Sequence, residues 1–364
     1  MSNTYYGDYL ETERLLNLQN PRSVELGRPA HEEMLFIITH QAYELWFKQI
    51  LHEIDSVLDI FEEAYVEDSL LNTAVSRLER VIEIQKLLVN QIEIMETMRP
   101  LDFLEFRDLL VPASGFQSVQ FRLIENRLGL RKSSRLKYHQ KDYQESLCPM
   151  HQQVVMNSEN EASLFQSVEA WLERTPFLQF GDFDFWQSYR QAVDTMFAQE
   201  RAMIEDNPVL SEKDVAFRLR QLENTELEFK TLFDAQRYRE LLDSGEKRLS
   251  YRATQAALLI LLYRERPILH APYRLLTAIT TIDELLTNWR YRHAQMVQRM
   301  IGSKQGTGGS MGYNYLIKTL DSHCIFNDFT QLTTFLIPRS QLPVLPDTVE
   351  RQLGFYAEKD LNHE

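Results

Sequence analysis

Nine histidines are the first candidates for chemistry in this chain of 364 residues, because imidazole binds metals and transfers protons near neutral pH. Most metal-binding patterns are absent. No Glu-x-x-His pair occurs, which excludes the ligand set of a di-iron carboxylate bundle. His31 begins a sequence like HExxH, but Leu35 stands where the second histidine belongs. The spacing therefore excludes these two classes of metalloenzyme.

His293 differs from the other histidines because helical spacing surrounds it with apolar side chains. These neighbours are Leu286, Trp289, Met296, Val297 and Met300. A single buried histidine can bind haem iron as an axial ligand. It can equally be a core histidine whose ring nitrogens are satisfied by polar neighbours. Periodicity leaves both interpretations open.

His40 lies one helical turn after Phe36, and Glu44 and Phe47 continue the same face. An imidazole next to aromatic side chains could line a pocket for an aromatic ligand. A core histidine bonded to a carbonyl and a hydroxyl fits the same pattern. The two alternatives stay open here as well.

Phe103 and Arg107 repeat this spacing in a shorter helical segment. A guanidinium group beside an aromatic ring is suited to binding the carboxylate of an aromatic amino acid. The alternative is a salt bridge between Arg107 and a nearby glutamate.

The segment 302–310, GSKQGTGGS, follows the His293 helix directly. It lacks the Lys-Ser/Thr of a Walker motif, and Met311 occupies the third glycine position of GxGxxG. Glycines at 306, 308 and 309 could bring backbone N–H groups close to an anion, and Thr307 offers a hydroxyl. A plain flexible turn is the alternative.

Long helices must position these residues, since apolar residues recur at spacings of three and four and only 12 Gly and 12 Pro interrupt the chain. The sequence shows no convincing strand and no internal repeat. We therefore predict an all-α helical bundle that forms one domain over residues 1–364. The expected helices run over about 33–61, 73–98, 159–174, 183–205, 211–242, 251–264 and 272–302.

Two segments look different from this bundle. Residues from about 211 to 246 are rich in both charge signs and predict a projecting helix or hairpin. The first twenty residues have little core spacing but contain Tyr5, Tyr6, Tyr9 and Leu10. We expect this N-terminal arm to dock, for instance on a neighbouring subunit.

Composition limits the partners. Lys and Arg total 39 against 53 Asp and Glu, and the formal charge of -14 repels both nucleic acid and anionic lipid. No signal sequence or membrane-spanning apolar run is present, and the two cysteines form no zinc-binding pattern. We expect a cytoplasmic protein that binds neither nucleic acid nor membrane.

Five segments together resemble the tryptophan 2,3-dioxygenase family. They are TYYGDYL (4–10), HEEMLFIITHQAYELWFKQI (31–50), LDFLEFRDLLVPASGFQSVQFRLIE (101–125), NWRYRHAQMVQRMIGSKQGTGGSMGYNYL (288–316) and FLIPR (335–339). Between about 132 and 246 few family residues are recognisable. The sequence departs from the family pattern at Met311 and over 322–327.

The resemblance implies an all-α homotetramer, a dimer of dimers, that contains haem b with ferrous iron in its active form. It implies that His293 is the axial iron ligand and that His40 lies on the opposite, catalytic side. Substrate contacts would come from Phe36, Phe103, Arg107, Thr307 and the arm residues Tyr6, Tyr9 and Leu10. Ser114 and Gly306 would lie near the haem and oxygen.

The resemblance also implies the reaction, which is cleavage of the indole C2–C3 bond of L-tryptophan by O2 to give N-formyl-L-kynurenine. One alternative is a related haem enzyme that oxidises another indole derivative. The presence of Arg107, Thr307 and His40 argues against it, because such a substrate would not need all three. A helical scaffold or ligand-binding protein without catalysis is the second alternative, and failure to bind haem would identify it.

Overall fold

The computed structural model describes residues 4–63, 65–136, 142–176, 178–180, 183–307 and 312–354. The chain divides into two compact units. Unit 1 comprises Met1–Asp59, Ser76–Leu164 and Thr281–Ile325. Unit 2 comprises Ile60–Val75, Phe165–Thr280 and Phe326–Glu364. The expectation of one domain over the whole chain remains a prediction.

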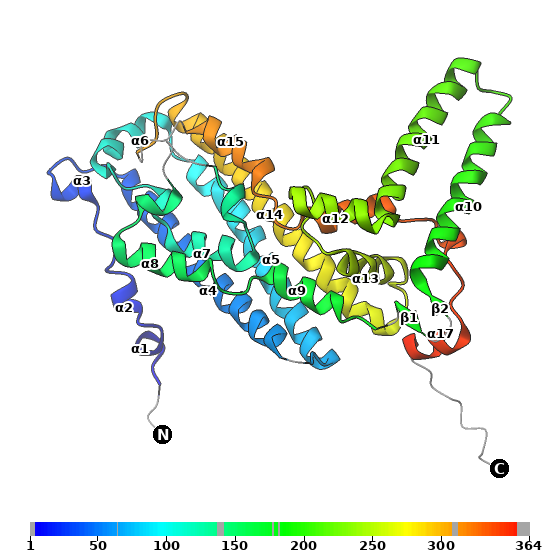
Figure 1. Cartoon of the computed structure of the whole chain (residues 1–364). Coiled ribbons are helices and arrows are strands. Elements are labelled where there is room, and N and C mark those ends of the chain that lie inside the picture. The colour runs from blue at the N-terminus through cyan, green and yellow to red at the C-terminus, as the bar shows by residue number, and fades with distance from the viewer. Residues whose placement is uncertain are drawn as a thin grey trace, which may run out of the picture. The chain divides into compact units, whose positions relative to one another are not determined.

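Helices dominate both units (Figure 1), which confirms the predicted all-α class. The α-helices that lie wholly or mainly in unit 1 are α1 (Tyr6–Leu10), α2 (Thr12–Leu15), α3 (Arg22–Glu25), α4 (Glu32–Glu62), α5 (Asp68–Glu96), α6 (Pro100–Phe106), α7 (Val119–Leu128), α8 (Pro149–Ser158), α14 (His270–Ile301) and α15 (Tyr313–Ser322). Those of unit 2 are α9 (Leu164–Glu173), α10 (Phe185–Glu205), α11 (Glu212–Phe233), α12 (Ala235–Ser244), α13 (Tyr251–Leu262), α16 (Asn327–Gln331) and α17 (Asp347–Leu353). In the described part of the chain no helix combines the length and apolar composition that crossing a membrane requires.

Short 3-10 helices connect several of these α-helices. They are η1 (Arg107–Leu110), η2 (Gly115–Gln117), η3 (Lys132–Ser134), η4 (Tyr143–Ser146), η5 (Pro267–Leu269), η6 (Leu332–Phe335) and η7 (Arg339–Gln341). The first two matter most for the site, because they follow α6 and precede α7.

Two predictions about secondary structure were wrong in detail. The helix expected over 211–242 is two helices, because the Asp234 side chain accepts hydrogen bonds from the backbone N–H groups of Gln236 and Arg237 and so starts α12. A short antiparallel pair of strands, β1 (Gln179–Phe180) and β2 (Phe183–Asp184), also occurs where no strand was expected.

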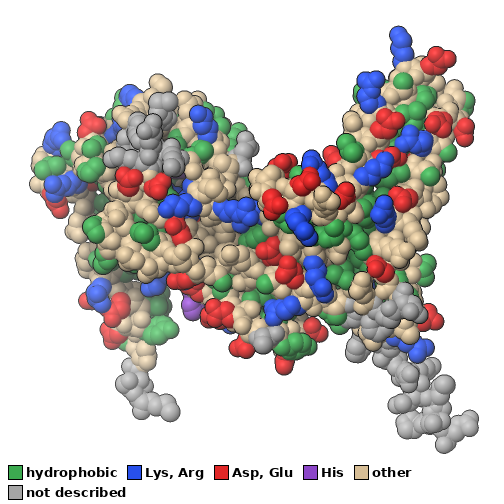
Figure 2. Space-filling view, viewed as in Figure 1, with side chains coloured by type: hydrophobic (Ala, Val, Ile, Leu, Met, Phe, Trp, Pro, Cys, Tyr) green, Lys and Arg blue, Asp and Glu red, His purple; other side chains and the backbone are tan. Residues whose placement is uncertain are grey.

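The projecting charged segment also differs from its predicted extent. Within unit 2, α10 and α11 lie side by side as a helical hairpin (Figure 1), and α12 is not part of it. Acidic and basic side chains intermix along this hairpin (Figure 2), while Leu222, Phe229 and Leu232 of α11 are buried. Its charge pattern is that of a solvated helix pair with one apolar seam.

A core of unit 1 lies directly against the predicted site. Met95, Met98, Phe106 and Met300 are buried together, and Phe36, Phe103 and Met296 pack against them. Apart from Met98, which lies between α5 and α6, these residues come from α4, α5, α6 and α14, which the chain brings together from distant positions. Because the same side chains belong to the core and to the cavity wall, core packing fixes the shape of the cavity.

Candidate active site

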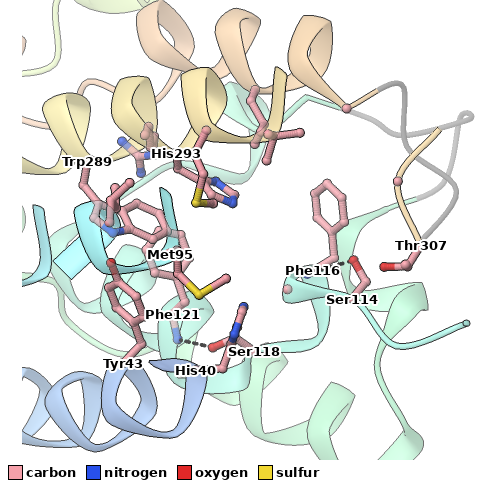
Figure 3. A pocket seen from close by; sticks show the side chains of 18 of the residues that line it. His40, Tyr43, Met95, Ser114, Phe116, Ser118, Phe121, Trp289, His293 and Thr307 are labelled. Carbon is pink, nitrogen blue, oxygen red and sulfur yellow. Dashed lines mark hydrogen bonds between the residues drawn. The ribbon is translucent and has the colours of Figure 1, made fainter. Parts of the chain in front are cut away.

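Unit 1 encloses a cavity of about 320 Å³ that gathers most of the predicted site residues (Figure 3). Its lining includes Phe36, His40, Phe103, Arg107, Ser114, His293, Gly306 and Thr307. His40 and His293 enter from opposite sides, from α4 and α14 (Figure 3). Gly308, Gly309, Ser310 and Met311 lie outside the described residues.

His40 is oriented by its own helix. Its Nδ1 lies 2.7 Å from the carbonyl oxygen of Phe36, which can only accept, so Nδ1 carries the proton and donates. The ring is open to the cavity and enclosed by protein, and this burial lowers its pKa against the opposing effects of the Phe36 carbonyl and Glu44. A neutral ring with a proton on Nδ1 leaves Nε2 as a hydrogen-bond acceptor at the cavity surface.

His293 has the properties of a potential metal ligand. Burial lowers its pKa to about 4, with a smaller contribution from His40, so the ring is neutral at physiological pH. It stacks on Trp289, with the ring centroids 5.2 Å apart. None of the described residues makes a hydrogen bond with the His293 ring. The structure therefore supplies a neutral imidazole with its coordinating nitrogens uncommitted.

Aromatic rings build one wall of the cavity. Phe36 packs on His40, with centroids 4.1 Å apart, and on Phe103 at 5.9 Å. Phe106 supports both phenylalanines from the core at 5.7 and 5.4 Å. A flat aromatic ligand would meet ring faces and edges on this side, an arrangement that favours stacking.

Arg107 and Thr307 hold two separate segments together at the cavity. Arg107 Nη2 donates to the carbonyl oxygen of Gln305, and the Thr307 hydroxyl donates to the carbonyl oxygen of Ala113 at 2.8 Å. The Nε of Arg107 is buried without a hydrogen-bond partner. A carboxylate is a stronger acceptor for a guanidinium group than a carbonyl is, so an anionic ligand can replace the Gln305 contact.

Ser114 occupies the turn before α7. Its hydroxyl accepts a hydrogen bond from the backbone N–H of Phe116 at 3.3 Å, and the Gln117 side chain accepts one from its backbone N–H at 3.3 Å. This reciprocal capping fixes the serine at the cavity wall.

The three predicted arm residues do not line this cavity. Tyr6, Tyr9 and Leu10 belong to α1, and their exposed fractions are 73%, 75% and 43%. So much exposed apolar surface on a short helix is unusual for a monomer. Their predicted contact with a substrate stays a prediction.

A polar group at the cavity wall was missed from the sequence. Glu125 accepts hydrogen bonds from Arg122 Nη1 and Arg290 Nη2, each at 3.0 Å, and from Arg135 Nη1. Burial opposes ionisation of this carboxyl group, but the guanidinium groups hold its pKa well below the ordinary value. His323 lies beside it, with Nδ1 3.4 Å from Glu125 Oε1. Except for Arg135, these side chains line the cavity.

A weak signal for this group exists in the sequence. Arg122 and Glu125 have the i, i+3 spacing of a helical ion pair, and Arg290 precedes His293 by three residues. Neither pattern indicates that the two helices meet. The pairing of Glu125 with Arg290 spans 165 residues and follows only from the fold.

Fold and site together define a class: an all-α protein with an aromatic-lined cavity in which two neutral histidines face one another beside an arginine. Comparison with known proteins then identifies the family. The tryptophan 2,3-dioxygenase family model matches residues 1–336, and the chain belongs to this family.

Individual relatives agree with this assignment. The tryptophan 2,3-dioxygenase of Bdellovibrio bacteriovorus is 51% identical over 352 residues, which cover 97% of this chain and 98% of the relative. That of Dictyostelium discoideum is also 51% identical, over 96% of this chain and 88% of its own length. Tryptophan 2,3-dioxygenase B of Danio rerio is 46% identical, over 95% of this chain and 85% of the relative.

Proposed function

We propose that this protein is a haem-dependent dioxygenase that cleaves the indole C2–C3 bond of L-tryptophan. The reaction consumes one O2, places one oxygen atom on each of the two carbons and yields N-formyl-L-kynurenine. Family membership supports this function, and the decisive structural observation is the acceptor nitrogen of His40 opposite the neutral His293 across an aromatic cavity.

The residues present fit a haem. Among the described residues, no three His, Cys, Asp or Glu side chains come together as a metal site. His293 would hold the iron of the haem through a ring nitrogen. The guanidinium groups around Glu125 would face the carboxylates of the cofactor.

Haem b with ferrous iron, when bound, supplies the activation of O2. The protein's contribution is to bind and orient the amino acid. Phe36 and Phe103 hold the indole ring between His40 and the core. His40 Nε2 accepts a hydrogen bond from the indole N–H, and this contact orients the ring without removing its proton. Ser114 and Gly306 lie close to the reacting centre.

The amino-acid end of the substrate is bound by the residues that now hold the Gln305 and Ala113 carbonyls. Arg107 exchanges its carbonyl acceptor for the substrate carboxylate, and Thr307 adds a hydroxyl for the carboxylate and ammonium end. Because both residues bridge segments of the cavity wall, binding the substrate also fixes that wall.

The exposed arm supports a further part of the proposal. Tyr6, Tyr9 and Leu10 of one subunit would complete the substrate site of a neighbour, within a homotetramer built as a dimer of dimers. Deletion of residues 1–20 should then raise KM for L-tryptophan strongly while haem content stays normal. Unchanged KM would exclude the exchange. We also propose a cytoplasmic location.

One experiment tests the function. Haem-loaded, ascorbate-reduced protein is mixed with L-tryptophan under isotopically labelled O2, and the product is identified by mass. N-formyl-L-kynurenine that carries two labelled oxygen atoms supports the proposal. A haem spectrum with no product from L-tryptophan, but with product from another indole, would refute it, and absence of haem binding would indicate a non-catalytic protein.

A further inference from the structure

Glu125 joins four parts of unit 1 through one carboxylate. Oε2 accepts from Arg122 of the same helix, α7, and from Arg135 in the segment after η3. Oε1 accepts from Arg290 of α14 and lies 3.4 Å from the His323 ring, just after α15. The exposed fraction of Glu125 is 1%.

The group carries an excess of positive charge. Three guanidinium groups surround a single carboxylate, and with a neutral His323 the net charge is +2. The Nε of Arg122, the Nε of Arg135 and the Nε2 of His323 are buried without hydrogen-bond partners. Buried charge without a counter-charge is costly, so a site of this kind favours an anionic ligand.

Aromatic rings also contact two of these arginines. The Arg135 guanidinium lies 4.2 Å from the centroid of the Tyr143 ring, and that of Arg122 lies 5.7 Å from Phe116 and from Tyr143. Tyr143 is itself held by Glu159, which accepts its hydroxyl hydrogen bond at 2.6 Å. The guanidinium planes are therefore oriented before any ligand arrives.

We propose that Glu125 is a positioning residue, which holds Arg122 and Arg290 together as one cationic wall, with Arg135 bound behind them, and thereby retains the carboxylate edge of the haem. This inference rests on the proposed haem site. By its charge alone, Glu125 would weaken haem binding, since a carboxylate repels the carboxylates of the cofactor. The proposed positioning role would strengthen haem binding instead.

Substitution of Glu125 can either tighten or weaken haem binding, and the direction of the change distinguishes two roles of this carboxylate. If Glu125 acts mainly as a counter-charge, Glu125→Gln should tighten haem binding, because the wall becomes more positive. If Glu125 positions the arginines, the same substitution should weaken it, because the amide can accept from fewer arginines and its NH2 group opposes the rest. Glu125→Asp keeps the charge but shortens the side chain by one methylene group, so any effect there comes from geometry.

The test measures transfer of haem from the holoenzyme to excess apomyoglobin by visible absorption. Loss of a residue that orients the ligands of a metal costs about 10–100-fold in affinity, and we take this as the scale for a residue that orients the proposed partners of the haem carboxylates. We expect haem to leave Glu125→Gln faster by this order, and Glu125→Asp by a smaller factor. KM for L-tryptophan, measured with haem in excess, should change little, because Glu125 touches neither Arg107 nor Thr307.

Glu53→Gln is the matched control. Glu53 is a buried carboxylate of α4 that accepts from Arg80 at 2.8 Å and from Gln49 at 2.7 Å, and it does not line the cavity. The Glu53→Gln substitution should lower the free energy of unfolding but leave the rate of haem transfer unchanged. If Glu125→Gln does not fold, Glu125→Asp carries the test. Transfer from both variants at or below the wild-type rate would overturn the inference, whereas a wild-type protein that binds no haem would overturn the proposed function itself.

Discussion

Two hollows in this protein differ in whether their polar groups have hydrogen-bond or ion-pair partners. The cavity of unit 1 measures about 320 Å³, whereas the hollow between α10 and α11 in unit 2 measures about 460 Å³. In the larger hollow, Arg201 pairs with Glu226 at 2.7 Å, and Lys230 lies 3.6 Å from the same carboxylate. In the smaller one, buried N–H groups of Arg107, Arg122 and Trp289 have no hydrogen-bond partner.

The difference shows that volume is a poor guide to function here. Among the described residues, none of the buried polar atoms without a partner belongs to the lining of the larger hollow. Arg201 and Lys230 both pair with Glu226 there, and Phe197, Phe229 and Phe233 form an ordinary apolar seam. Unsatisfied buried polar groups and lowered histidine pKa values distinguish the smaller cavity from the larger hollow, and they are the observations on which the proposed ligand site rests.

The largest expected effect concerns the proposed iron ligand. His293→Ala should give a folded protein that retains no stable haem, because the axial nitrogen is lost while the cavity remains. Haem content per chain, measured as the pyridine complex after purification, checks this result. His270→Ala is the matched control, since His270 is an exposed residue of the same helix. Normal haem content in the His293 variant would contradict the ligand assignment.

Arg107 gives the next largest effect. Loss of one partner of a buried, charge-assisted pair costs about 2–5 kcal/mol, so Arg107→Ala should raise KM for L-tryptophan by about 30-fold or more. Steady-state kinetics at fixed haem content measures this change. Arg99→Ala provides the control, because Arg99 is an exposed arginine that pairs with Asp102 outside the cavity. An unchanged KM in the Arg107 variant would exclude its binding of the carboxylate.

Much of the fold of unit 1 and of its cavity could be predicted from the sequence. The long helices α4, α5 and α14 follow from apolar spacing, and the residues they carry, Phe36, His40 and His293, meet at one cavity as expected. The helical spacing around His293 and around His40 was nevertheless compatible with an ordinary core histidine at each position. The bond from His40 to the Phe36 carbonyl and the position of both histidines at the cavity follow only from the fold.

Other features could not be predicted, for definite physical reasons. The break at Asp234 depends on a side-chain cap that competes with continuation of the helix. α7 was not among the expected helices, and it carries Arg122 and Glu125, whose partner Arg290 is far away in sequence. Tertiary pairing of this kind leaves no periodic signal in either segment.

His40 should show a moderate effect, because it contributes one neutral hydrogen bond to the substrate. Such a bond contributes about 0.5–1.5 kcal/mol, so His40→Ala should lower kcat by up to about tenfold without abolishing turnover or haem binding. Single-turnover rates of the haem-loaded variant test this. His52→Ala, an exposed position on the same helix, should behave as wild type. Complete inactivity of the His40 variant with haem retained would mean that His40 does more than orient the indole.

The smallest expected effect concerns the hollow of unit 2. Arg201→Met removes the central cation of the larger hollow, whose partner Glu226 can still pair with Lys230. Because partly exposed ion pairs contribute little, the midpoint of thermal unfolding, KM and haem content should all stay near their wild-type values. A change in KM or in haem content would show that the hollow of unit 2 influences the site of unit 1. The distinction drawn from unsatisfied polar groups would then fail, since a hollow whose lining contains no buried polar atom without a partner among the described residues would also act on ligand binding.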